Sequence, residues 1–296
     1  MKPYFIVSML ICFLTGPLLA ADDTREVSMV PKEIYGSPSD NIRIRLGNGG
    51  AGPTGLLKAL ADDYLTEKSA TYSIAWYQDV SPKTLEQLKK GVIDIALVDE
   101  KNQGDQAVAD GWATHPTPIF NDQFLIIGPI SNPASIATGD TTEPCLRKIA
   151  QRGNLESYPL FLSRDDQSAT NVKEQSLWTL TGLSPWTSTA NWYFRFHVFP
   201  KDALIRAAGD GLYTITDRGT WLSTRAEISN CRIYVEGGEQ LLNPCFALLG
   251  AHPTEETMEF LTYLTSIRAQ HLISEFGKNT YQGDALFTSA QLGLPD

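Results

Sequence analysis

A short strand, a glycine-rich loop and the start of a helix follow one another near the beginning of this chain. Residues 42–46 are strand-like, residues 47–55 contain five glycines, and residues 56–65 carry apolar side chains at helical spacing. Glycine lets the backbone turn sharply, and the first turn of a helix leaves N–H donors unpaired. The segment therefore predicts a strand–turn–helix unit whose turn either binds an anion or binds nothing.

The same alternation of strands and helices continues along the chain and sets the expected fold class. Strands separated by helices imply a parallel sheet with right-handed crossovers. Turn residues between 130 and 142 indicate a crossing into a second lobe, so we expect an α/β protein with a ligand cleft between two lobes. Further strands are expected at 72–77, 93–98, 123–127, 160–162, 212–215, 233–235 and 246–249, and helices at 84–90, 143–152, 168–180 and after Thr254.

Two local expectations concern the last third of the chain. Thr254 is a good N-cap for the final helix. The buried stripe of that helix is expected at Met258, Leu261, Leu264 and Ile267. Export would permit a disulfide, and the pairing expected from the chain is between Cys231 and Cys245, which leaves Cys145 free.

The amino terminus predicts export and a simple division of the chain. Residues 1–21 have the pattern of a cleaved secretory signal, with Lys2 before an apolar run that is short for a membrane anchor. The protein is therefore expected to be secreted or periplasmic. The expected parts are the signal at 1–21, a polar leader at 22–40, lobe 1 at 41–128 and 230–296, and lobe 2 at 129–229.

Composition narrows the classes of partner. The net charge of -10 argues against nucleic acid, although a small anion is still allowed because its site depends on local donors. The histidines and cysteines lack the spacing of a metal site, so we expect no metal and no cofactor. We expect a monomer that binds a small anionic ligand.

A second strand–loop–helix unit at 161–171 adds a guanidinium to the hydroxyls of its loop. Arginine offers a planar fork of donors that suits an oxyanion. Asp165 and Asp166 either orient this arginine or cap the helix, and the whole loop is otherwise a capped helix with a solvated arginine. The candidate ligand contacts in this loop are Ser163, Arg164, Ser168 and Thr170.

Six further positions complete the candidate site, which draws on both units. In the first unit the expected donors are Asn48, Gly49 and Gly50. Ser81 heads the next helix and is either a third donor or an N-cap. Asp217 can cap the turn that follows it, and Arg218 either reaches the cleft or pairs with Asp217; both are expected to support the site from behind.

Three motifs occur in the order found in one known family: Asn121-Asp122-Gln123-Phe124, Ser163-Arg164 with Ser168-Ala169-Thr170, and Thr214-Ile215-Thr216-Asp217-Arg218-Gly219-Thr220. With the first-strand loop they resemble the tungstate-binding periplasmic proteins of the TupA type, from about residue 42 to residue 250. The resemblance implies a type II periplasmic-binding-protein fold and a tetrahedral oxyanion held between the lobes. It also implies an ABC importer as partner if the protein is bacterial.

The chain departs from this family in its first loop. The family has a Thr-Thr-Thr-Ser run there, whereas Gly47-Asn48-Gly49-Gly50 stands in this chain and replaces hydroxyl donors with one amide side chain and bare backbone. This glycine-rich loop resembles that of secreted fungal relatives more than that of bacterial importers. The identity of the anion is therefore left open between tungstate or molybdate and a small anionic metabolite.

Two enzyme hypotheses are weaker alternatives to a non-catalytic binding protein. A secreted hydrolase or transferase would need a nucleophile beside a base, and the chain has no Gly-x-Ser-x-Gly elbow. A Rossmann-type oxidoreductase is suggested by the spacing of Gly47, Gly49 and Gly52, with Asp79 as a ribose partner, but export disfavours a nicotinamide cofactor.

Overall fold

The computed structural model describes residues 30–37, 41–99, 101–156 and 158–290. The expected signal at 1–21 lies outside these ranges. Part of the expected leader is ordered into strand β1 (Glu33–Tyr35), which pairs antiparallel with β3 (Ser73–Tyr77). The expectation of a loose leader is wrong for these residues, because Tyr35 is fully buried and the strand gains backbone hydrogen bonds at the edge of the sheet.

A first group of strands forms a mixed sheet in the order β1-β3-β2-β4-β10-β5. Strand β2 (Ile42–Gly47) runs parallel to β3 and to β4 (Ile95–Val98), as expected. Strands β10 (Leu242–Gly250) and β5 (Ala113–Pro129) pair antiparallel, so the expectation of a purely parallel sheet is wrong there. Antiparallel neighbours need no helical crossover between them.

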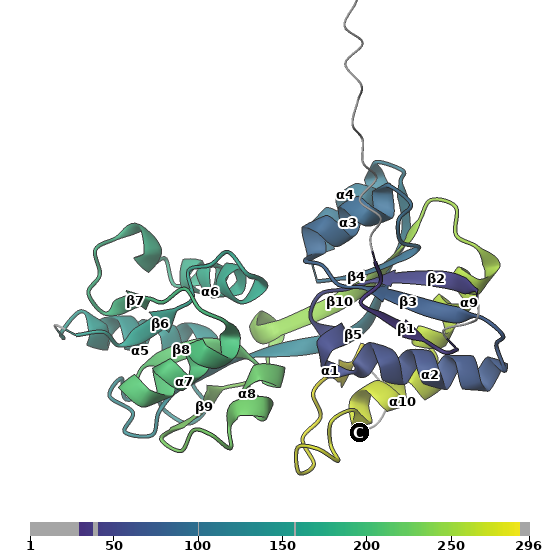
Figure 1. Ribbon diagram of the computed structural model, residues 1–296. Coiled ribbons are helices and arrows are strands. Elements are labelled where there is room, and N and C mark those ends of the chain that lie inside the picture. The colour runs from purple at the N-terminus through teal and green to yellow at the C-terminus, as the bar shows by residue number, and fades with distance from the viewer. Residues whose placement is uncertain (1–29, 38–40, 100, 157, 291–296) are drawn as a thin grey trace, which may run out of the picture. The chain divides into compact units, whose positions relative to one another are not determined.

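Helices cover both faces of this sheet (Figure 1). The short helix α1 (Ala51–Thr54) and the longer α2 (Leu56–Lys68), α9 (Glu255–Leu264) and α10 (Ile267–Glu275) lie on one face. Their apolar residues form a core with Ile44, Leu46, Ile74 and Trp76 of the strands. Helices α3 (Ser81–Lys89) and α4 (Lys101–Ala109) lie on the other face.

The expected buried stripe of the final helix is wrong in part. Thr254 does cap α9, since its hydroxyl accepts from Thr257 N at 3.2 Å. Met258 is 48% exposed and Ile267 is 71% exposed. A second cap at Ser266 starts a new helix, so Ile267 does not continue the face of α9. The buried residues of α9 are Thr257, Phe260, Tyr263 and Leu264.

A second core surrounds the carboxyl-terminal half of β5. This half pairs with β8 (Tyr213–Asp217) and β9 (Cys231–Val235), and β6 (Phe161–Ser163) lies parallel between β8 and β7 (Tyr193–Arg195). Strand β9 was expected in the first lobe, but its register places it beside the strands of the second core. Val235 packs in that core.

Successive side chains of β5 point to opposite faces of this second group of strands, as in any β-strand. Phe124 and Ile126 pack with residues of α5 (Thr142–Gly153) and α6 (Ala169–Leu180), whereas Leu125 and Ile127 pack with Leu204 of α7 (Pro200–Asp210). The remaining elements are η1 (Pro185–Thr187), α8 (Arg218–Thr224), η2 (Glu239–Leu241) and β11 (Thr288–Ser289). None of the helices in the described ranges has the length and apolar character needed to cross a bilayer.

The three cysteines of the described chain are all free, so the expected disulfide is wrong. Cys231 lies opposite Pro129 on β5, and Cys245 lies opposite Phe120 on the same strand. Those two positions are about 30 Å apart at the rise of a strand, whereas a disulfide needs Cα atoms within roughly 7 Å. A shared neighbouring strand therefore holds the two thiols apart.

Candidate anion-binding site

The first loop, residues 47–50, leads from β2 into α1 and is shaped by Asn48. The Asn48 side chain is only 6% exposed. Its Oδ1 accepts from Ala51 N at 2.8 Å and Gly52 N at 3.2 Å, and its Nδ2 donates to Leu97 O at 2.9 Å. Its carbonyl accepts from Trp76 Nε1 at 3.0 Å. Asn48 thus holds the turn together, and a direct contact of its side chain with a ligand stays a prediction.

The glycines of the first loop allow a close approach of backbone to backbone. A Cβ on Gly49 would lie 2.7 Å from the carbonyl oxygen of Asp79, whereas a Cβ on Gly50 would meet nothing within 4 Å. Within the described part of the chain, the amide N–H groups of Gly49 and Gly50 donate to no other residue. They are unoccupied donors beside the start of a helix, which is the arrangement that suits an anion.

Ser81 is the first residue of α3 and does not cap it, because the N-cap position is held by Val80. The N-cap alternative for Ser81 is therefore wrong. Its hydroxyl donates to Asp99 Oδ1 at 2.5 Å, and Asp99 also accepts from Asn243 Nδ2 at 3.2 Å. The Ser81 hydroxyl hydrogen is thus already committed, and binding of a ligand by Ser81 stays a prediction.

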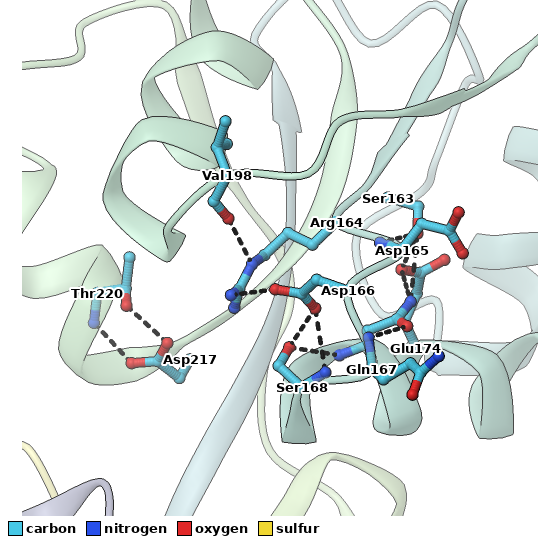
Figure 2. A network of polar contacts seen from close by, with 11 residues as sticks. Ser163, Arg164, Asp165, Asp166, Gln167, Ser168, Glu174, Val198, Asp217 and Thr220 are labelled. Carbon is cyan, nitrogen blue, oxygen red and sulfur yellow. Dashed lines mark hydrogen bonds and ion pairs between the residues drawn. The ribbon is translucent and has the colours of Figure 1, made fainter.

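The second loop, residues 163–170, contains an arginine that is already paired (Figure 2). The side chain of Arg164 is 11% exposed, its Nε donates to Val198 O at 3.1 Å, and its Nη2 pairs with Asp166 Oδ2. The other oxygen of Asp166 accepts from Ser168 N at 3.1 Å and from Ser168 Oγ at 2.6 Å. One carboxylate therefore joins the guanidinium to the start of α6, and the hypothesis of a solvated arginine is wrong.

Ser163, at the start of the same loop, is hydrogen-bonded to a buried carboxyl group. Its hydroxyl donates to Glu174 Oε2 at 2.6 Å, and Glu174 Oε1 accepts from Tyr193 OH at 2.6 Å. Glu174 is 2% exposed, and burial raises its pKa to about 7, against the opposing effect of hydrogen bonds from Ser163, Tyr193 and Asn171. The loop is thus anchored on a buried carboxyl group.

Thr170 and Asp217 lie beside Arg164. Together with Thr216 they border a crevice that is too narrow to admit a water molecule in this conformation. Asp217 caps α8 as expected, since its two oxygens accept from Thr220 N at 2.7 Å and Thr220 Oγ1 at 2.6 Å. Thr170, Thr216 and Asp217 are thus the polar residues that line this crevice with Arg164 and Thr214.

Arg218 does not pair with Asp217, so that expectation is wrong. Its Nη1 lies 3.1 Å from Glu236 Oε2, its Nη2 lies 3.3 Å from Asp284 Oδ1, and its Nε donates to Ala285 O at 2.8 Å. Both oxygens of Asp217 instead accept from Thr220. Support of the site by Arg218 stays a prediction.

Residues 36–268 match the family model described as a PBP superfamily domain. The chain belongs to the PBP superfamily. It is 31% identical to the tungstate-binding protein TupA of Peptoclostridium acidaminophilum over 215 residues, 70% of this chain and 71% of the relative. It is 26% identical to TupA of Campylobacter jejuni over 233 residues, 75% of this chain and 82% of the relative.

A solved structure agrees with this assignment. The tungstate-binding protein TupA of Desulfovibrio alaskensis G20 superposes with a TM-score of 0.75 at 28% identity, covering 84% of this chain and 99% of that one. The resemblance to the TupA-type family and the two-lobed periplasmic-binding-protein fold are thereby confirmed.

Within this PBP fold the predicted residues fall into two groups. Ser163, Arg164, Ser168 and Thr170 lie together in the second loop, with Asp217 beside them. Asn48, Gly49 and Gly50 lie in the first loop. Among the described residues, no hydrogen bond or ion pair joins residues 47–50 or Ser81 to residues 163–170. The two groups therefore share no direct polar contact among the described residues.

Sequence reasoning missed Glu174 and underrated Asp166. Glu174 lies three and four residues before Leu177 and Trp178, so all three share the buried face of α6. This spacing is the sequence signal from which a buried carboxyl group could have been predicted. Asp166 was considered as a partner of Arg164, but its simultaneous contact with Ser168 depends on the path of the loop. Asp122 was named only as part of a family motif; burial and the nearby Asp217 raise its pKa well above the usual range.

Proposed function

We propose that this protein is a non-catalytic, extracytoplasmic solute-binding protein whose ligand is a small tetrahedral oxyanion of the tungstate and molybdate class. The observation that carries the proposal is that Arg164 and the residue at the start of α6 donate hydrogen bonds to the same group. A guanidinium, a main-chain N–H and a hydroxyl there converge on the oxygens of one carboxylate, that of Asp166. A donor set that holds a carboxylate in this way has the chemistry needed for an oxyanion.

The first loop supplies the second half of the proposed site. Its free amides at Gly49 and Gly50 are donors without side chains, so they select negative charge and allow a close approach. Closure of the lobes follows from bridging, because an anion held by both loops is fully satisfied only when the two loops come together. The names of the relatives, which are tungstate-binding proteins, favour tungstate among the candidate oxyanions.

A location outside the cytoplasm and delivery to a membrane importer follow as part of the same proposal. The signal-like pattern of residues 1–21 supports export. An ABC importer is the partner expected of a TupA-type protein in a bacterial cell. The ligand is released chemically unchanged in this function, because the protein carries it and does not transform it.

A thermal-shift panel followed by calorimetry tests the proposal. A ligand that binds only the folded state raises the unfolding temperature, so tungstate or molybdate should raise it more than sulfate, phosphate or acetate at equal concentration. Calorimetry should then give one bound anion per chain. An unfolding temperature that no oxyanion changes would contradict the proposal.

A further inference from the structure

The carboxylate of Asp166 occupies the donors that the ligand is proposed to use. Its Oδ2 pairs with Arg164 Nη2, and its Oδ1 accepts from both the N–H and the hydroxyl of Ser168. Figure 2 shows this carboxylate between the guanidinium and the start of α6. Each N–H or O–H hydrogen can serve one acceptor well, so an incoming oxyanion and Asp166 compete for the same groups.

Arg164 does not need Asp166 to hold its position. Its Nε is anchored separately on the carbonyl oxygen of Val198 at 3.1 Å, and its stem is nearly buried. Its Nη1 donates to no other residue in the described part of the chain. The guanidinium is thus oriented from the backbone, and Asp166 adds a negative charge where the ligand charge would lie.

The backbone on both sides of Asp166 is strained. Asp165 has φ +43° and Gln167 has φ +60°, so two residues with side chains adopt the left-handed conformation. Hydrogen bonds hold them there: Asp165 N donates to Ser163 Oγ at 3.2 Å, and Gln167 N donates to Asn171 Oδ1 at 3.1 Å. These contacts do not involve Asp166, so the loop backbone on both sides of Asp166 is held independently of its carboxylate.

We propose that Asp166 is a built-in surrogate ligand, which fills the second loop when no oxyanion is present and must be displaced for one to bind. The inference rests on the proposed function and adds to it a residue that competes with the ligand for its donors. A displaced competitor weakens every oxyanion by the same factor. Ligands with few other contacts then fall below useful affinity, and only those that also satisfy the first loop are retained.

The test compares two tetrahedral anions of the same shape and different charge, tungstate with two negative charges and perrhenate with one. Affinities of both are measured by calorimetry for the wild-type protein and for Asp166→Asn. We expect Asp166→Asn to bind both anions more tightly by the same factor. That factor is on the order of tenfold if the released loop is populated about one part in ten.

The matched control is Asp165→Asn, which removes a neighbouring charge that does not occupy the donors. Asp165 faces Arg195 at 3.8 Å and His197 at 3.5 Å instead. Its removal changes only the local field, so it should strengthen tungstate more than perrhenate, and by less than Asp166→Asn does. A crystal of the wild-type protein with tungstate should show the Asp166 carboxylate turned away from Arg164.

Three results would overturn the inference while leaving the proposed function in place. Weaker binding by Asp166→Asn would mean that Asp166 orients Arg164. A gain that is much larger for the dianion would mean that Asp166 stays beside the ligand as a fixed charge. A gain no larger than that of Asp165→Asn would mean that its contacts with the donors are irrelevant. Wild-type protein that binds neither anion would instead refute the proposed function itself.

Discussion

The two loops proposed to hold the ligand have the same local plan and opposite states. Each follows a strand and precedes a helix, and each carries donors suited to an anion. In the first loop the amides of Gly49 and Gly50 are free among the described residues. In the second loop the hydroxyls of Ser163 and Ser168 and the Nη2 of Arg164 donate to carboxylates of the protein itself.

The difference shows how the composition of a loop determines whether its donors find partners within the protein. Glycines have no side chains that could accept from the N–H groups of the loop, so these N–H groups remain available to donate to solvent or a ligand. A loop rich in acids and hydroxyls satisfies itself when it folds, because a buried guanidinium without a partner is costly. If both proposals hold, ligand binding is an addition at the first loop and an exchange at the second.

The largest expected effect comes from removing the guanidinium of the second loop. Arg164→Ala should weaken tungstate binding by about 100-fold or more, because two charge-assisted hydrogen bonds of about 1.5–3 kcal/mol each are lost. The fold should persist, since Asp166 keeps its contacts with Ser168. Calorimetry gives the affinity, and chemical denaturation checks the fold.

Arg164→Lys is the control for this first comparison. Lysine keeps the charge but loses the planar fork, so its affinity should fall between those of the wild type and Arg164→Ala. An unchanged thermal response to tungstate in Arg164→Ala would show that the first loop binds the anion alone. The second loop would then have a purely structural role.

The second prediction concerns the buried carboxyl group beneath the second loop. The pKa of Glu174 is raised from 4.5 to about 7 in the folded protein by burial. Between those pH values the folded chain retains a proton that the unfolded chain has lost, so stability falls as pH rises. Glu174→Gln lacks this titration, and its unfolding free energy relative to wild type should rise by on the order of 3 kcal/mol from pH 4 to pH 8.

Denaturant unfolding at a series of pH values measures this difference. Glu143→Gln is the matched control, because Glu143 lies on an exposed helix face, where it pairs with Arg147. A difference between wild type and Glu174→Gln that stays flat with pH would mean that folding does not raise the pKa of Glu174. The first loop, residues 47–50, contains no carboxyl group, so substitutions in it should leave the pH dependence of the unfolding free energy unchanged.

Much of the fold was predictable because its signals are local. The helix after the first loop, the strand at 93–98 and the cap at Thr254 each follow from spacing or from one residue type. What could not be read locally was pairing between distant segments. The antiparallel placement of β10 and the separation of Cys231 from Cys245 depend on which part of β5 each neighbour meets.

The candidate site divides in the same way. The residue types of the second loop were enough to predict donors for an anion, and the glycines of the first loop were enough to predict exposed amides. The occupancy of those donors was not predictable, because it depends on positive φ values at Asp165 and Gln167 that bring Asp166 back over Arg164. Nothing in the spacing of these residues fixes that path.

A third, smaller effect is expected from the residue that shapes the first loop. Asn48→Ala leaves the amides of Ala51 and Gly52 and the carbonyl of Leu97 without their partner, which should cost about 2 kcal/mol of stability. Its loss of tungstate affinity should be smaller than that of Arg164→Ala, because the amides of the loop remain.

Asn154→Ala is the control for Asn48→Ala. Asn154 accepts from Trp192 Nε1 at 2.8 Å in the second core, so its removal destabilises the protein without touching either loop. Tungstate affinity should be unchanged in that variant. If calorimetry ranks Asn48→Ala below Arg164→Ala in affinity, the main ligand contact lies in the first loop, contrary to the comparison drawn above.

The smallest effect separates two adjacent glycines of the first loop. Gly49→Ala places a Cβ 2.7 Å from the carbonyl oxygen of Asp79, so the backbone must shift, at a cost of about 1 kcal/mol. Gly50→Ala meets open space at a φ of -85° and should change stability by less than about 0.5 kcal/mol. Both variants keep their N–H groups, but only Gly49→Ala moves them, so only Gly49→Ala should lose affinity for tungstate. Equal affinities in calorimetry would show that these amides do not touch the ligand, and the free donors of the first loop would then be open for a reason unrelated to binding.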